Sequence, residues 1–225
     1  MEITPIAVIK NDFSDKFAIP RQSGIAAGIK SKIVFEKDYA HADGVKGLEG
    51  YSHLWLIWGF SENIKPKHSL TVRPPRLGGN KRVGVFATRS PFRPNNLGLS
   101  SVKLEKIEFD SADRPTLIVS GADLMNNTPI YDIKPYIAYS DCHADAKCGF
   151  VDSTEFNRLQ VIFPKNLKKV LSPESVENLT AVLEQDPRPA YHNDENRIYG
   201  FRFAEHEIKF KVKGNTLTVV DIENE

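Results

Sequence analysis

The first 140 residues contain at least six short runs of β-type sequence and no long amphipathic helix between them. Runs of β-branched and aromatic residues that are bounded by Gly, Pro, Asn or Asp are typical of strands. Many short strands without intervening helices predict a mainly β domain, in the form of a closed or nearly closed barrel. The candidate strands are residues 4–9, 31–35, 51–60, 82–88, 97–109, 116–120 and 128–139.

The run from Tyr51 to Phe60 is the most apolar of these candidates, and it contains both tryptophans of the chain. Such a continuous apolar run is typical of a strand that is buried on both faces. His53 within it is therefore expected to be a core histidine and not a catalytic residue.

The sequence changes character near residue 140, where a polar segment rich in small residues predicts a linker. A strand is expected over residues 158–163 and a helix over 173–184, with Ser172 as its cap and Pro173 at its first position. Strands follow at 198–203, 207–212 and 216–222. We expect a barrel domain over residues 1–142 and a small α+β domain over residues 143–225.

The bulk composition is that of an ordinary globular protein, with 40% hydrophobic and 26% charged residues and a formal net charge of +1 over 225 residues. No apolar run reaches the roughly 18 residues that a membrane span requires. The first residues also lack the basic flank and apolar core of a signal peptide. A cytoplasmic protein with no membrane partner is expected.

Common catalytic and cofactor motifs are missing from the sequence. There is no GxGxxG after a candidate strand, no GxxxxGK[ST], no GxSxG and no HExxH. Cys142 and Cys148 are the only cysteines, and their spacing fits neither CxxC nor a two-pair zinc pattern, although His143 lies beside the first. No metal site is expected.

The strongest local signal is a basic window between Glu62 and Glu105 that contains no acidic residue. Glycines and prolines recur through it at turn-like spacings, which favours loops that fix arginines close to a ligand. A polyanion is the natural partner of such a window, and Arg73, Arg76, Lys81 and Arg82 are assigned to phosphate contacts. Its basic residues are Lys65, Lys67, Arg73, Arg76, Lys81, Arg82, Arg89, Arg93 and Lys103.

Two further segments combine groups that suit a small polar ligand. Pro20, Arg21 and Gln22 place a guanidinium and an amide just before Gly24. In residues 128–139 a carboxylate and an ammonium, from Asp132 and Lys134, interrupt an apolar run. A strand end of this kind suits a ligand that carries both an amine and a carboxylate. The alternatives are a connecting loop with a solvated arginine and an exposed ion pair of little energetic value.

Several of these strings together resemble a known family. Pro20-Arg21-Gln22, GLEGYSHLWLIWGF from Gly47, VGVFATRSPFRPNNLGLSS from Val83, and Asp132-Ile133-Lys134-Pro135 with Tyr139 are similar to the TsaA-like (VirR-like) domain of the tRNA N6-threonylcarbamoyladenosine methyltransferases, the TrmO or YaeB family. The resemblance covers about residues 1–142. Residues 186–191 (DPRPAY) also resemble the C-terminal extension of the bacterial members.

This resemblance implies a single-sheeted β-barrel enzyme that works as a homodimer and uses S-adenosylmethionine outside the Rossmann-type fold. The implied substrate is threonine tRNA carrying threonylcarbamoyladenosine next to the anticodon, which is methylated at N6. The resemblance does not identify which residue, if any, takes the N6 proton. The implied cofactor contacts are Pro20, Arg21, Gln22, Phe60, Ser61, Arg89, Leu99, Asp132, Ile133, Lys134 and Pro135.

Two alternatives compete with this enzyme. One is a non-catalytic β-barrel module that binds RNA through the same arginines, since both functions require a positive face. The other is a metal-dependent hydrolase that uses His143 and the cysteines. The match of strings on separate segments favours the methyltransferase.

Overall fold

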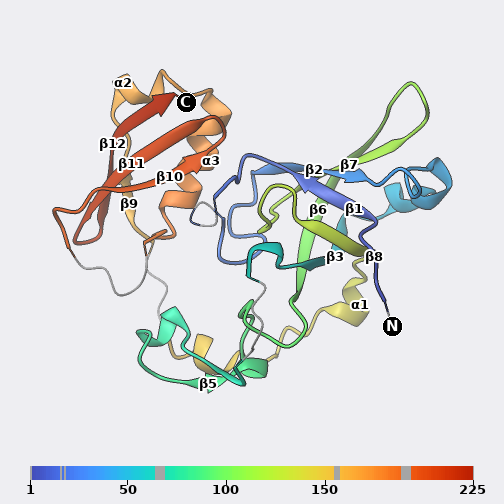
Figure 1. Ribbon diagram of the computed structural model, residues 1–225, viewed down its shortest axis with the longest axis horizontal. Helices are drawn as coiled ribbons and strands as arrows, with labels where there is room; N and C mark the ends of the chain where they lie inside the picture. The colour runs from blue at the N-terminus through green and yellow to red at the C-terminus, as the bar shows by residue number, and fades with distance from the viewer. Residues whose placement is uncertain are drawn as a thin grey trace.

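The computed structural model describes residues 2–15, 17, 19–63, 69–154, 158–188 and 194–224. Six antiparallel strands close into a barrel in the order β1-β2-β7-β6-β3-β8, and β8 pairs back onto β1 (Figure 1). The predicted mainly β class and barrel are confirmed. The barrel strands are β1 (Ala7–Lys10), β2 (Lys30–Phe35), β3 (His53–Gly59), β6 (Leu97–Phe109), β7 (Pro115–Ser120) and β8 (Pro129–Pro135).

Side chains alternate along β3 between the barrel interior and its outer surface. Leu54 and Leu56 are fully buried, whereas Trp55 and Ile57 are half-buried on the outside. The prediction of a strand buried on both faces was therefore wrong, because a barrel made from one sheet has only one core face. Trp55 is used on the outer surface because its ring packs 5.5 Å from that of Tyr136 and its Nε1 donates to Asp141.

The prediction for His53 was also wrong. His53 is the first residue of β3 and is exposed, with its Nδ1 2.9 Å from Ser52 Oγ. A position at the end of a strand leaves the ring in solvent.

The predicted strand at residues 82–88 is mostly a turn outside the barrel. Only β5 (Val83–Gly84) is extended, and it pairs with β4 (Thr71–Val72) in a separate two-stranded ribbon. A 3₁₀ turn, Val85–Ala87, follows at once, because Thr88 donates to the Val85 carbonyl through both its backbone N–H and its hydroxyl. This ribbon and the neighbouring loops lie below the barrel in the view of Figure 1.

The C-terminal part has a four-stranded mixed sheet in the order β10-β11-β12-β9, in which β9 is parallel to β12. α3 begins as predicted, with Ser172 Oγ accepting from the Ser175 N–H at 3.0 Å. The predicted small α+β fold is confirmed. Its elements are β9 (Gln160–Ile162), α2 (Lys165–Lys168), α3 (Pro173–Leu183), β10 (Tyr199–Phe203), β11 (His206–Lys213) and β12 (Thr216–Asn224), and α1 (Ala138–Asp141) precedes them. None of the helices that the structure describes could cross a membrane.

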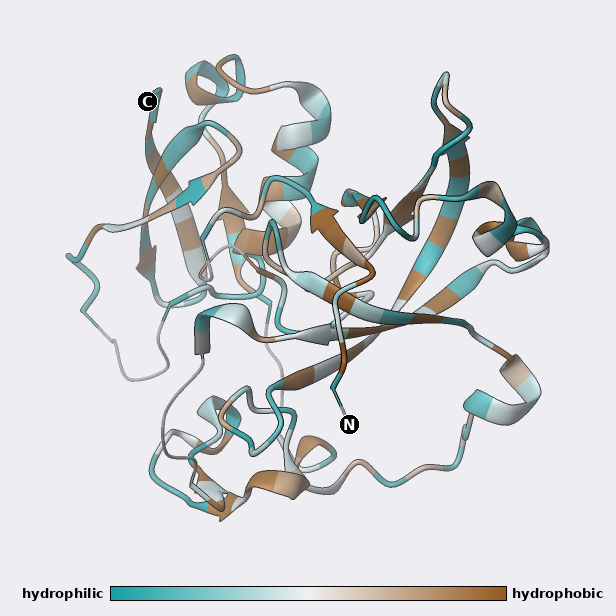
Figure 2. Cartoon of the chain, turned by 45° about the vertical axis from the view of Figure 1, so that its right-hand side comes forward, coloured by the Kyte–Doolittle hydropathy of each residue, from teal (hydrophilic) through white to brown (hydrophobic). Residues whose placement is uncertain are grey.

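The segment between β1 and β2 connects the two parts of the chain. Its Phe13, Ala26 and Ile29 are buried in the same core as α3 and the C-terminal sheet, and the Phe13 ring lies 6.2 Å from that of Phe203. From the other side, Gly24 N–H donates to the β7-end carbonyl of Gly121 at 2.8 Å. The loop that carries Pro20, Arg21 and Gln22 is thus fixed by both parts of the chain, although it has no regular structure (Figure 1). Figure 2 shows hydrophobic and hydrophilic residues alternating along strands on both sides of it.

A polar chain runs from the barrel interior to this loop. Trp58 Nε1 donates to Ser100 Oγ at 2.9 Å, and the Ser100 hydroxyl donates to Asp123 Oδ1 at 2.5 Å. Burial raises the pKa of Asp123 above its usual 3.8, while the Ser100 hydroxyl, the Ser23 backbone N–H and the charge of Arg89 act in the opposite direction. The carboxylate therefore lies between the barrel core and the segments that carry Ser23 and Arg89.

Gly98 is required because the Trp58 indole occupies the space of a side chain. A Cβ at position 98 would lie 2.3 Å from Trp58 Cε2. We expect Gly98→Ala to lower the free energy of unfolding by about 1–3 kcal/mol through overpacking, as measured by urea denaturation. Gly84→Ala is the control, since no atom lies within 4 Å of its Cβ position and its φ is −59°; an equal loss in both variants would contradict the account.

Asp123 should make stability fall as pH rises. A carboxyl group with a raised pKa binds its proton more tightly in the folded state, so folding is opposed once the pH passes from about 3.8 through the raised value. The unfolding free energy of wild type minus that of Asp123→Asn should therefore decrease with pH over this window and then level off. Asp110→Asn should show the opposite sign, because Arg114 lowers the pKa of Asp110 to about 2. A flat difference for Asp123→Asn in urea titrations would contradict the burial argument.

Candidate functional site

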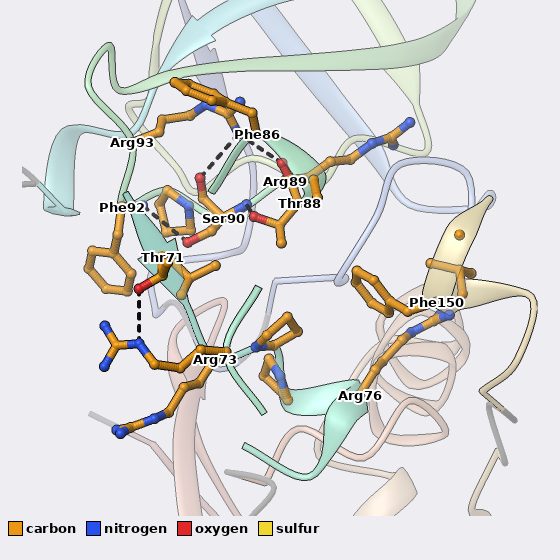
Figure 3. Close-up of a pocket in the computed structure, with 18 of the residues that line it drawn as sticks. Thr71, Arg73, Arg76, Phe86, Thr88, Arg89, Ser90, Phe92, Arg93 and Phe150 are labelled. Carbon is orange, nitrogen blue, oxygen red and sulfur yellow. Dashed lines mark hydrogen bonds between the residues drawn. The ribbon is translucent and has the colours of Figure 1, made fainter. Parts of the chain in front are cut away.

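A wide cleft of about 1460 Å³ lies between the loops below the barrel and the segments that flank them (Figure 3). Its walls come from the β4–β5 region, from residues 86–96 and from residues 147–151. Arg21 and Gln22 from the β1–β2 segment and Arg188 from the C-terminal part complete it. The cleft therefore brings together residues 21–22, 69–96, 147–151 and 188, which are far apart in the sequence.

The cleft is strongly positive. Seven arginines and Lys147 line it, and none of its described lining residues is acidic. Desolvation lowers the pKa of Arg21 below its usual value, and the like charge of Arg76 lowers it further, whereas the charge of Asp186 opposes both effects. Anions should therefore concentrate here. The arginines are Arg21, Arg73, Arg76, Arg82, Arg89, Arg93 and Arg188.

Neutral acceptors, and not carboxylates, orient most of the arginines whose contacts are resolved. Arg82 Nε donates to Thr71 Oγ1 at 2.9 Å, and Arg89 Nη1 donates to Gln22 Oε1 at 2.6 Å. Arg93 Nη1 donates to the Thr88 carbonyl at 3.1 Å. A carbonyl or hydroxyl fixes a guanidinium without cancelling its charge, so the positive potential is retained.

The backbone of these loops is fixed by proline and glycine. Pro75 begins a 3₁₀ turn, Pro75–Leu77, which ends at Gly78 with φ 72°, a left-handed conformation that favours glycine. This turn places Arg76 on the cleft wall. Asn96 Nδ2 donates to the Pro91 carbonyl at 2.7 Å and braces the next loop.

The C-terminal part contributes through residues 185–188. Arg21 Nη2 donates to the Asp186 carbonyl at 2.7 Å, and Gln185 Oε1 accepts from the Arg21 backbone N–H at 3.4 Å. The Asp186 carboxylate is used separately, since both its oxygens accept from Arg188 at 2.8 Å. Residues 185–188 therefore position two cleft arginines. Residues 189–191 of the predicted motif lie outside the described residues.

The residues predicted to bind the cofactor fall into two groups. Arg21, Gln22 and Arg89 meet in the cleft through the Arg89–Gln22 hydrogen bond, and the buried Pro20 precedes them. Phe60 lies nearby, as its N–H donates to the carbonyl of the cleft residue Asn96 at 2.8 Å. Ser61 is exposed at the start of the following 3₁₀ turn.

The second group lies on the barrel strands β6 and β8, on either side of β3, and its Leu99, Asp132 and Lys134 are on the outer face. Leu99 and Asp132 both pair with Ile57 in the strand register, and Asp132 forms an ion pair with Lys134 at 2.8 Å. Leu99 is 55% exposed. None of these residues lines the cleft.

Ile133 and Pro135 alternate with the outward pair. They are in register with the buried Leu56 and Leu54, and Ile133 packs against the barrel core. Any contact of these two residues with a ligand on the outer face would therefore use their backbone.

The residues predicted to bind RNA are mostly in the cleft. Arg73, Arg76 and Arg82 line it, whereas Lys81 is exposed in the turn before β5 and does not. Lys65 and Lys67 of the basic window lie outside the described residues.

Sequence reasoning missed several residues of the cleft. Phe86, Phe92, Phe150, Arg93 and Arg188 line it but were assigned no role. The acid-free window contains Arg93 and the tail motif contains Arg188, so each had a signal, whereas Phe150 lies in a segment that was interpreted as a linker. Among the described residues, no group of three or more His, Cys, Asp or Glu side chains could hold a metal ion.

Comparison with known proteins gives matches over most of the chain. Residues 8–142 match the family model of the tRNA-methyltransferase O N-terminal domain, and residues 157–225 match the TrmO C-terminal domain. The tRNA (adenine(37)-N6)-methyltransferase of Escherichia coli is 37% identical over 215 residues, which cover 92% of this chain and 91% of that protein.

A named relative and a solved structure from Pseudomonas aeruginosa are also similar. A protein named "Putative S-adenosylmethionine-dependent methyltransferase RcsF" is 38% identical over 231 residues, covering 98% of this chain and 96% of that one. The crystal structure of TrmO from the same organism superposes with a TM-score of 0.79 at 29% identity, covering 100% of this chain and 98% of the other. Matching domains in the same order, full-length relatives and the shared barrel place this chain in the TrmO family.

Proposed function

We propose that this protein is an S-adenosylmethionine-dependent methyltransferase that methylates N6 of adenine 37 in tRNA, next to the anticodon. The observation that carries the proposal is the cleft, in which arginines for a polyanion adjoin the Gln22–Arg89 pair of the predicted cofactor group. The activity named for the Escherichia coli relative agrees with it. The substrate we expect is threonine tRNA with threonylcarbamoyladenosine at this position, and such a substrate implies a cytoplasmic protein.

The groups present fit S-adenosylmethionine, whose bound form supplies an electrophilic methyl group on a sulfonium. The ligand carries an ammonium, which requires an acid, and a carboxylate, which requires a cation. Asp132, paired with Lys134, provides the acid, and Arg89, paired with Gln22, provides the cation. The exposed Leu99 offers an apolar surface on the same face, across Ile57 from Asp132. The arginines would hold the anticodon loop by its phosphates, so that the chain contributes chiefly by positioning.

The division of the cofactor residues into two groups supports a homodimer with composite sites. One chain has the cleft group and the outer-face group in different places, so a single ligand would meet both only if a second copy brought its outer face to the cleft. The outer face and the residues after β8 also expose large apolar side chains, which favours coverage by a partner. These are Leu97, Leu99, Ile137 and Tyr139.

The activity is tested by incubating threonine tRNA that carries threonylcarbamoyladenosine with the protein and S-adenosylmethionine, and by measuring the methylated nucleoside by mass spectrometry. Wild type should methylate it. Asp132→Asn and Arg89→Gln should weaken donor binding by about ten- to a hundredfold in calorimetry, because each removes a charge-assisted contact. Asp113→Asn and Arg114→Gln, in the β6–β7 turn, are matched controls and should change neither quantity.

Binding of tRNA without methylation would contradict the proposal and favour the non-catalytic RNA-binding module. Methylation that persists in the presence of a chelator would remove the metal-dependent hydrolase class. Unchanged donor affinity in both site variants would remove Asp132 and Arg89 from the donor site.

The composite site is tested by mixing two inactive variants, Arg89→Ala and Asp132→Ala. If each site takes Arg89 from one chain and Asp132 from the other, a mixed dimer has one native site, and random exchange should restore about a quarter of the wild-type activity. A mixture that stays inactive, although mass spectrometry detects mixed dimers, would show that both residues belong to one chain's site. An active monomer in light scattering would refute the dimer itself.

A further inference from the structure

Phe86 is an apolar ring that the fold holds out into the cleft. It is 74% exposed, whereas its neighbour Val85 is fully buried. The 3₁₀ turn that carries both is closed by two hydrogen bonds from Thr88 to the Val85 carbonyl, at 3.1 Å and 2.8 Å. Burial of Val85 thus anchors the turn, and the next side chain must point away from the core.

Phe92 is presented by the adjacent loop in a similar way. It is 38% exposed and lines the same cleft. Its N–H donates to Ser90 Oγ at 3.2 Å, and Arg93 fastens the loop through the carbonyls of Thr88 and Ser90. Figure 3 shows both rings at the cleft among the arginines.

Exposed rings on braced turns, between cations, have the composition of a binding site for single-stranded nucleic acid. Guanidinium groups contact the phosphates there, and aromatic faces stack on bases that are unpaired. A duplex keeps its bases stacked on each other and cannot use such rings. Because an adenine must leave its stack before its N6 can be reached, a stacking partner beside the site has a direct use.

We propose that Phe86 and Phe92 form a stacking platform for unpaired bases of the anticodon loop that flank the target adenine. The inference rests on the proposed function, because it assumes an RNA substrate. It adds that the cleft selects a looped, single-stranded segment through ring stacking, while the arginines bind phosphates without regard to base pairing.

The test uses the full-length protein and an RNA hairpin with a seven-nucleotide anticodon loop that carries 2-aminopurine beside position 37. Phe86→Ala and Phe92→Ala should each weaken hairpin binding by about 5- to 150-fold and reduce the quenching of 2-aminopurine. Phe86→Trp should keep hairpin affinity and 2-aminopurine quenching near their wild-type values. Phe86→Leu should lower both, because leucine keeps apolar bulk but lacks a π face. Phe109→Ala is the control, since this ring is 50% exposed at the end of β6, away from the cleft.

Two further readouts separate stacking from charge and from donor binding. The salt dependence of hairpin binding should be unchanged in the phenylalanine variants, whereas Arg82→Gln should reduce its slope by about one unit. Affinity for S-adenosylmethionine should stay at the wild-type value in Phe86→Ala and Phe92→Ala.

Three results would overturn the platform. The first is wild-type hairpin affinity in both alanine variants, and the second is equal hairpin affinity in Phe86→Leu and Phe86→Trp. The third is a loss of affinity for S-adenosylmethionine in the alanine variants without a loss of RNA affinity. In each of these cases wild type would still methylate tRNA, so the proposed function would stand. A wild-type protein that binds neither the hairpin nor threonine tRNA would overturn both proposals together.

Discussion

Repulsion among the cleft arginines is the constraint on which the rest of the structure depends. Seven guanidinium groups line one cleft whose described lining residues include no acid, and their mutual repulsion opposes folding. The Asp186 carboxylate, which is not among the lining residues, pairs with Arg188. Carboxylates would relieve this repulsion but would also cancel the attraction for a polyanion. The chain instead orients several arginines with carbonyl, hydroxyl and amide oxygens, from Thr71, Gln22 and the Thr88 and Asp186 backbone. The cost of holding these charges together is thus met by packing elsewhere.

That packing explains the role of the C-terminal part. The β1–β2 segment has no regular structure, yet Phe13 and Ile29 lie in the C-terminal core, and Asp186 accepts from Arg21. Burial of each large apolar side chain contributes about 1.5–3 kcal/mol. The C-terminal part therefore stabilises the loop that brings Gln22 to Arg89, and it contributes Arg188 to the cleft itself.

Local patterns predicted the elements well where one principle decides the local structure. Strand alternation and turn residues were sufficient for the barrel, and the Ser172 cap with Pro173 was sufficient for α3. The errors came where tertiary structure decides. Trp55 resembles a core residue but covers the outer surface against Tyr136, and Val85 to Ala87 form a turn because Thr88 closes it.

The candidate site was predictable in its chemistry and not in its arrangement. The acid-free window and the Arg21 and Asp132 segments were visible as motifs. Phe150 and Arg188 reach the cleft only through the folding of distant segments, and no local signal marks that proximity. The division of the cofactor residues between the cleft and the outer face depends on strand register, which places Leu99 and Asp132 beside Ile57.

The most direct measurement of the central claim, that the arginine cleft receives the anticodon loop, is photo-crosslinking. A threonine tRNA with 4-thiouridine in the anticodon loop would be irradiated with the wild-type protein, and the crosslinked peptides identified by mass spectrometry. We expect crosslinks to the segments of residues 71–96 and 147–151, with competition by unlabelled tRNA. Crosslinks confined to the β9–β12 sheet, with none in the cleft segments, would contradict the account.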